Sequence, residues 1–154
     1  MNLVDSIKSI KYDSSIKIEN TSHQAVFMAS YVTEKYPDDE YYKIFFRDNT
    51  ILEVIPSSQE FFFCDDSRRN IDRNLVTNNE EQLEIDGKKF LSNDSEDNQY
   101  LKKIYFGNIK DGEGNCIFRD YEFENEVWSL ATLKNGEKAD IHVRKISAED
   151  ISLI

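Results

Sequence analysis

The sequence predicts an α+β fold that is predominantly β: an antiparallel meander sheet or sandwich with one or two short helices. Three observations support this class, namely short apolar runs, turn residues between them, and many aromatic side chains. The chain of 154 residues contains ten Phe, eight Tyr and one Trp, and aromatic residues favour strands. Its length suits one hydrophobic core, so we expect residues 1–154 to form a single acidic, β-rich domain.

The N-terminal half contains four predicted strands in direct succession. Residues 24–34 and 41–48 flank the segment Tyr36-Pro37-Asp38-Asp39-Glu40, whose proline and aspartates favour a turn between paired strands. Residues 51–55 and 60–64 follow after short polar turns, and both are rich in apolar residues. Strands that succeed one another in this way indicate a meander.

The middle of the chain, between Cys64 and Asn98, is polar and predicts mainly loops. Residues 67–76 could form one helix within it. Further on, the apolar segments 83–85 and 89–91 flank the turn Asp86-Gly87, a dipeptide that favours a tight hairpin.

The C-terminal part contains the strongest hairpin signal, Asn135-Gly136, between residues 127–133 and 139–144. In the second arm, apolar and polar residues alternate, which predicts one buried face and one solvated face. Ser147 and Asp150 then form a capping pattern that predicts a short final helix.

The charge of the chain limits its partners. With 19 Lys plus Arg against 30 Asp plus Glu, the formal net charge is −11, which repels phosphate backbones and anionic lipids. We therefore expect no direct nucleic-acid binding, whereas a basic protein, a cation or a polyamine would be attracted. The sequence has no signal-peptide pattern and no apolar run of membrane-spanning length, which predicts a cytoplasmic protein without membrane insertion.

An alternating series of carboxylates is the leading candidate for a partner-binding surface. Asp120, Glu122, Glu124 and Glu126 recur at a spacing of two, so they would share one face of an extended strand. Such a strip repels itself unless water screens it or a basic partner covers it. A merely solvated face is the alternative interpretation.

Aromatic side chains could extend this binding surface. Strands with rings on both faces normally pack in a core, but exposed rings would mark a binding patch. Tyr41, Phe62 and Trp128 are the candidates.

The segment that begins at Asp111 partly imitates a calcium-binding loop. Asp111, Glu113, Asn115 and Glu122 occupy positions one, three, five and twelve, where such loops place their oxygen ligands. Cys116 stands at the sixth position, where the loop needs glycine. A glycine-rich hairpin turn is therefore the alternative to a calcium site.

Cysteine and histidine patterns give no support for catalysis or for a cofactor. Cys64 and Cys116 form no metal-binding or disulfide pattern, and we interpret both as small buried hydrophobic residues. His23 and His142 are interpreted as solvent-exposed residues without a role. Phosphate-binding and hydrolase motifs are absent from the sequence, so we expect no enzyme activity.

Two segments together resemble the YjfK-like family of uncharacterised bacterial proteins. The first is Tyr41-Tyr42-Lys43-Ile44-Phe45-Phe46-Arg47-Asp48 with the following Ile51-Leu52-Glu53-Val54. The second runs from Ile104-Tyr105-Phe106 through Asp111-Gly112 to Phe118-Arg119. The resemblance implies a cytoplasmic accessory protein linked to envelope-stress proteins, and it supplies no catalytic residues.

These observations lead to three functional hypotheses. The first is a non-catalytic intracellular binding or accessory protein that docks a basic protein partner on its acidic strand face. The second is an immunity or inhibitor protein that neutralises a basic toxin or nuclease, in one variant by mimicking DNA. The third is a calcium-binding module. The sequence leaves the partner's identity and the oligomeric state open.

Overall fold

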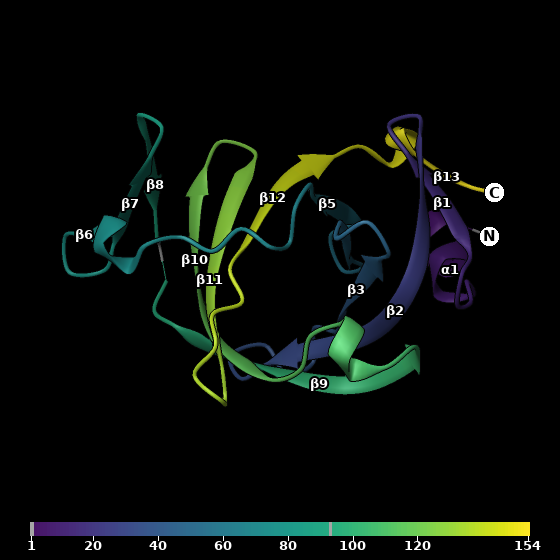
Figure 1. Cartoon of the computed structure of the whole chain (residues 1–154), viewed down its shortest axis with the longest axis horizontal. Coiled ribbons are helices and arrows are strands. Elements are labelled where there is room, and N and C mark those ends of the chain that lie inside the picture. The colour runs from purple at the N-terminus through teal and green to yellow at the C-terminus, as the bar shows by residue number, and fades with distance from the viewer. Residues whose placement is uncertain (1, 93) are drawn as a thin grey trace.

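The structure is a computed structural model that describes residues 2–92 and 94–154, and most of it is antiparallel β-sheet (Figure 1). Its helices are all short: α1 (Leu3–Lys8) and the 3-10 helices η1 (Arg73–Leu75), η2 (Ile109–Asp111) and η3 (Ala148–Asp150). The strands are β1 (Ser15–Ile18), β2 (Thr21–Thr33), β3 (Tyr41–Phe46), β4 (Ile51–Ile55), β5 (Glu60–Cys64), β6 (Val76–Thr77), β7 (Gln82–Ile85), β8 (Lys88–Leu91), β9 (Asp97–Phe106), β10 (Cys116–Phe123), β11 (Glu126–Leu133), β12 (Ile141–Ile146) and β13 (Ile151–Leu153).

Eight of the described strands close into a ring. β2 to β5 form a meander, β5 pairs with β12, and β12, β11 and β10 continue the sheet. β9 then pairs with β10 on one side and with the long strand β2 on the other. The sheet therefore has an inner and an outer face, and residues that alternate along each strand point to one or the other.

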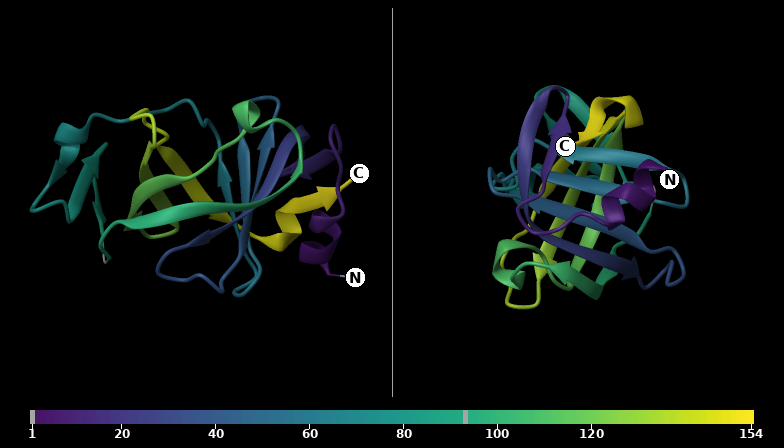
Figure 2. Two further views of the ribbon diagram at one scale, coloured as in Figure 1. Left: turned by 90° about the horizontal axis from the view of Figure 1, so that it is seen from below. Right: turned by 90° about the vertical axis from the view of Figure 1, so that its right-hand side faces the viewer.

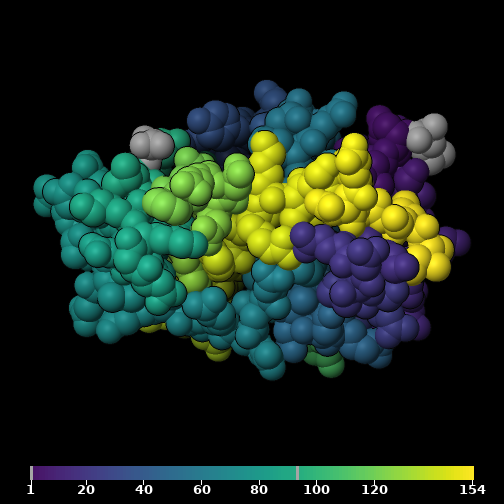
Figure 3. All heavy atoms as spheres, turned by 90° about the horizontal axis from the view of Figure 1, so that it is seen from above, coloured from purple at the N-terminus to yellow at the C-terminus, as the bar shows by residue number. Residues whose placement is uncertain are grey.

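The largest apolar core lies on the outer face of the ring. Side chains such as Ile44, Leu52 and Phe61 pack there against Ile7 of α1 and Ile16 of β1. β1 also pairs with β13, so the two ends of the chain lie side by side, as Figure 3 shows from above. Figure 2 places α1 and both termini at one end of the molecule.

The three strands β6, β7 and β8 project at the opposite end of the molecule (Figure 2). They cover a second, smaller core in which Leu83 and Phe90 pack against Tyr121, Trp128 and Leu130. The turn Asp86-Gly87 joins β7 to β8, and both residues have positive φ angles of 51° and 77°. This hairpin was predicted from its turn residues.

The structure confirms most predicted local elements. The strand pairs around residues 36–40 and around Asn135-Gly136 are present, and Ser147 forms a capping box with Asp150 at η3. The helix predicted over residues 67–76 is wrong, because only η1 is helical there.

The segment from Ser67 to Val76 is held by side-chain contacts in place of helical hydrogen bonds. Arg73 donates two hydrogen bonds of 2.7 Å to Asp140, which is fully buried. The same carboxylate accepts hydrogen bonds from the backbone N–H groups of Ile71 and Ala131. These bonds fix the segment across the outside of β11 and satisfy its backbone without a helix.

Among the described residues, no helix combines the length and the apolar character that crossing a membrane would require.

Candidate functional site

A cavity of about 390 Å³ lies inside the ring of strands. Its wall contains inward-facing residues of all eight strands of the ring. Those that matter for its chemistry are Tyr41, Lys43, Glu53, Phe62, Asp120 and Glu122. The volume falls in the range of small-molecule sites, and a cavity with a few convergent polar groups is the usual form of such a site.

The acidic strip expected on residues 120–126 is not continuous, and this corrects the sequence interpretation. Asp120 and Glu122 share the inner face of β10 and line the cavity. Glu124 lies in the turn after β10 with a φ of 53°. Glu126 starts β11, where it accepts one hydrogen bond from Lys88 and contacts His142. The four carboxylates therefore form no single outer face.

The three aromatic residues expected to bind a partner also lie in different places in the structure. Tyr41 and Phe62 line the cavity together with Asp120 and Glu122. Trp128 lies on the other face of its strand and is only 2% exposed, stacked on His142 with the guanidinium of Arg69 over its ring. It therefore offers no surface to a partner.

A buried ion pair joins Lys43, which lines the cavity, to Glu113, which lines a second hollow, and we call this pair the floor of the cavity. The Nζ of Lys43 donates to a carboxylate oxygen of Glu113 at 2.6 Å, and both side chains are less than a tenth exposed. Burial would lower the pKa of Lys43, but the Glu113 carboxylate overcomes this effect and raises that pKa well above its usual value. Lys43 therefore carries a charge that Glu113 already balances.

The loop between β9 and β10 brings Glu113 into this position. The hydroxyl of Tyr31 donates to the carbonyl of Glu113, and Gln99 donates to the carbonyl of Gly114. Gly112 lies so close to the Phe27 ring that a Cβ would overlap it. Only glycine at this position lets the loop close one end of the ring.

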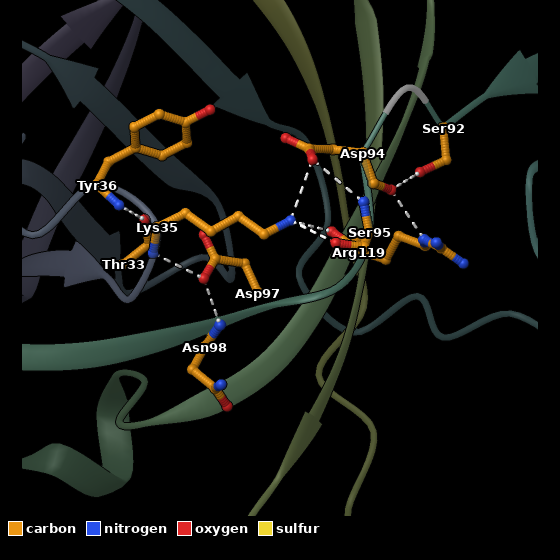
Figure 4. Close-up of polar contacts among 9 residues, drawn as sticks. All are labelled: Thr33, Lys35, Tyr36, Ser92, Asp94, Ser95, Asp97, Asn98 and Arg119. Carbon is orange, nitrogen blue, oxygen red and sulfur yellow. Dashed lines mark hydrogen bonds and ion pairs between the residues drawn. The ribbon is translucent and has the colours of Figure 1, made fainter.

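At the other end of the ring the cavity wall includes Lys35, Asp94 and Ser95, which we take as the mouth of the cavity. Figure 4 shows the polar contacts of these residues. Lys35 follows β2 and reaches across the mouth to Asp94 at 3.1 Å and to the hydroxyl of Ser95 at 2.7 Å. Its backbone N–H donates to Asp97 at 3.2 Å. Arg119 of β10 donates to the backbone carbonyl of Asp94. The loop that follows β2 and the loop that contains Asp94 and Ser95 are therefore tied to each other and to β10.

Two carboxyl groups of the inner wall have raised pKa values. Burial raises the pKa of Glu53 to about 7, against the opposing effect of Lys43. Burial also raises the pKa of Asp120, although its cross-strand neighbour Ser129 acts in the opposite direction. The side chain of Asp120 is enclosed by the strands of the ring, but it is still accessible to solvent. Its accessible surface faces the cavity.

Comparisons with protein-family models, curated proteins and solved structures found no match. The resemblance of residues 41–54 and 104–119 to the YjfK-like family therefore stays a prediction.

The structure does not gather the residues expected to bind calcium. Glu113 is paired with Lys43, and the side-chain oxygen of Asn115 accepts the backbone N–H of Leu101 at 2.7 Å. Asp111 lies in η2 and is exposed, whereas Glu122 faces the cavity. Within residues 2–92 and 94–154, no group of three or more His, Cys, Asp or Glu side chains is arranged to hold a metal ion.

The cysteines and one histidine lie where they cannot readily react. Cys64 and Cys116 are buried as predicted, and burial raises their thiol pKa values to about 11 and about 12. His23 was expected to be exposed, and this was wrong: it is 6% exposed between Phe46 and Phe63. Its Nδ1 lies 2.6 Å from Asp48, so its ring is held within the core.

A second hollow of about 500 Å³ lies beyond the floor, at the closed end of the ring. Three of its charged wall residues have protein partners: Arg47 pairs with Asp13, Glu113 pairs with Lys43, and Lys138 donates to the carbonyl of Ile71. The other two, Lys110 and Asp111, are exposed side chains. The inner cavity is the better candidate because protein encloses its carboxyl group Glu53.

Sequence reasoning missed Lys43 and Glu53, which are cross-strand partners on β3 and β4. A signal for both exists in the sequence. Each is the single charged residue within an apolar strand, Tyr41–Phe46 or Ile51–Ile55. A charge in such a position is uncommon unless it is paired or functional, so it could have identified the inner wall.

Proposed function

We propose that the chain is a non-catalytic binding protein that takes a small molecule into the interior of its ring of strands. The observation that carries this proposal is the cavity of about 390 Å³ whose wall includes carboxyl groups without an ion-pair partner among the described residues. Among these groups protein encloses Glu53, and an enclosed ionised carboxylate is costly in a folded protein unless a partner satisfies it.

The placement of the candidate residues favours this proposal over docking of a basic protein on β10. Docking requires a continuous acidic outer face, but Asp120 and Glu122 point inward. A small molecule can reach both groups, together with Tyr41 and Phe62, through the mouth beside Lys35.

Two further features support a binding role in a reducing compartment such as the cytoplasm. Cys64 and Cys116 are free thiols, which suits such a compartment. Both thiols have raised pKa values, and His23 is packed between aromatic rings, so none of these groups is poised as a nucleophile or base.

The test is a thermal-shift screen of neutral, anionic and cationic small molecules against three proteins. Ser129 faces the cavity, so Ser129→Phe should fill it. Thr132→Phe places the same ring on the exposed side of the same strand and serves as the matched control.

We expect one or more compounds to raise the Tm of the wild type and of Thr132→Phe, but not that of Ser129→Phe. Circular dichroism of all three proteins would establish that each is folded. A screen without any stabilising compound, or equal shifts in all three proteins, contradicts a ligand site in the cavity.

A further inference from the structure

We propose that the ligand of the cavity is a small organic cation with a primary ammonium group, held between Glu53 on one wall and Asp120 on the other. This inference rests on the proposed function and names the ligand class of the same site.

The first support is the balance of charge on the cavity wall. Each of its three cationic side chains already has an anionic partner in the protein: Lys43 pairs with Glu113, Lys35 with the wall residue Asp94, and Arg119 with Glu80. By contrast, the ion pairs found in the described part of the chain include none of Glu53, Asp120 and Glu122. The cavity therefore has surplus negative charge.

The second support is the position of these carboxyl groups around the ring. Glu53 lies on β4 and Asp120 on β10. Three strands separate β4 from β10 in either direction, namely β5, β12 and β11 on one side and β3, β2 and β9 on the other. The two groups therefore approach the cavity from opposite walls, and Asp120 is near enough to raise the pKa of Glu53.

The third support is the enclosure of Glu53. Protein surrounds this side chain, it lines the cavity, and no hydrogen-bond partner of its carboxyl group is found among the described residues. An ionised carboxylate in such a place needs a partner or takes up a proton. A ligand that brings positive charge and N–H donors satisfies it directly.

The aromatic residues of the wall fit the same ligand class. Tyr41, Phe62 and Phe118 line the cavity, and the faces of aromatic rings attract ammonium groups. Asp120 and Glu122, two residues apart on one face of β10, lie about 7 Å apart along the strand. A second amino group could use this spacing, so a short diamine is the natural probe.

Isothermal titration calorimetry with four probes tests this inference. The cationic probes are 1,4-diaminobutane and phenethylamine, and the matched neutral and anionic probes are butane-1,4-diol and succinate. We expect heat of binding for an amine and none for the diol or for succinate. No heat with either amine, or equal binding of the diol, overturns the inference.

Variants of the wall identify the binding groups. Glu53→Gln and Asp120→Asn keep the shape of each side chain but remove its charge, and each should weaken amine binding tenfold or more. Glu84→Gln changes an exposed carboxylate on β7 and should leave binding unchanged. If Glu53→Gln does not fold, Asp120→Asn alone decides, and unchanged amine affinity in a folded variant contradicts the inference.

The two proposals fail in different ways. If the thermal-shift screen finds only neutral or anionic ligands that the filled cavity rejects, the site exists but the ligand class is wrong. If the screen finds no ligand for the cavity, the proposed function itself fails.

Discussion

Lys43 and Glu113 form an ion pair of 2.6 Å between a strand of the ring and the loop that closes it, 70 residues further along the chain. Lys43→Met should lower the free energy of unfolding by about 3–5 kcal/mol, because it leaves the buried Glu113 carboxylate without its counter-charge. Urea unfolding followed by circular dichroism measures this loss.

The exposed pair between Arg47 and Asp13 provides the control. Arg47→Met should cost less than about 1 kcal/mol, because solvent screens that pair. If both variants lose the same small amount, the pair of Lys43 and Glu113 does not hold the floor of the cavity.

Glu53 gives the protein a pH dependence of stability. Its pKa is about 7 in the folded protein, above the ordinary value of 4.5. The folded state therefore keeps this proton to higher pH than the unfolded state, and the free energy of unfolding falls as the pH rises from about 4.5 to about 7. Above that range the full loss is about 3 kcal/mol.

Glu53→Gln removes the titrating group and should be about 3 kcal/mol more stable than the wild type at pH 8, but similar to it at pH 4. Urea unfolding of both proteins at the two pH values tests this, with Glu84→Gln as the exposed control. A difference that stays constant with pH would show that Glu53 does not titrate in this way.

The elements that the sequence predicts correctly are those specified by local residues. Gly136, Asp86 and Gly87 provide the positive φ angles that these tight turns need, and the flanking strands follow from their apolar residues. The helix over residues 67–76 failed because the segment depends on Asp140, a residue about 70 positions away. A local sequence pattern does not reveal contacts between residues so far apart in the chain.

The candidate site was only half predictable for a similar reason. The alternation of side chains along a strand correctly places Asp120 and Glu122 on one face of β10 and Tyr121 on the other. It does not reveal that their face points inward, because the ring closes through pairs such as β2 with β9 and β5 with β12. Polar residues on a strand normally indicate the solvated face, and here that face encloses a cavity.

Asp140 should be essential for the order of the segment between β5 and β6. Asp140→Ala removes the acceptor of Arg73 and of the backbone N–H groups of Ile71 and Ala131, which should cost about 3 kcal/mol. We expect a lower urea midpoint and new proteolytic cleavage within residues 66–75. Asp66→Ala removes only the partly exposed partner of the exposed Arg68 side chain and should leave both measurements unchanged.

Binding of an amine to the cavity should depend on pH in the direction opposite to stability. At pH 6 most Glu53 side chains are protonated, whereas at pH 8 most are ionised, because the pKa is about 7. A primary amine stays protonated throughout this range. Its affinity should therefore rise about tenfold from pH 6 to pH 8, and binding at pH 7 should release protons.

The other charged groups around Glu53 set the size of this effect. Lys43 from β3 lowers its pKa, whereas Asp120 from β10 and Glu113 from the closing loop raise it. Calorimetry with 1,4-diaminobutane at pH 6, 7 and 8, in buffers of different ionisation enthalpy, measures both affinity and proton release. Glu53→Gln should flatten the pH profile and reduce the number of protons released, and a wild-type affinity that does not change with pH would rule out ionised Glu53 as the group that binds the amine.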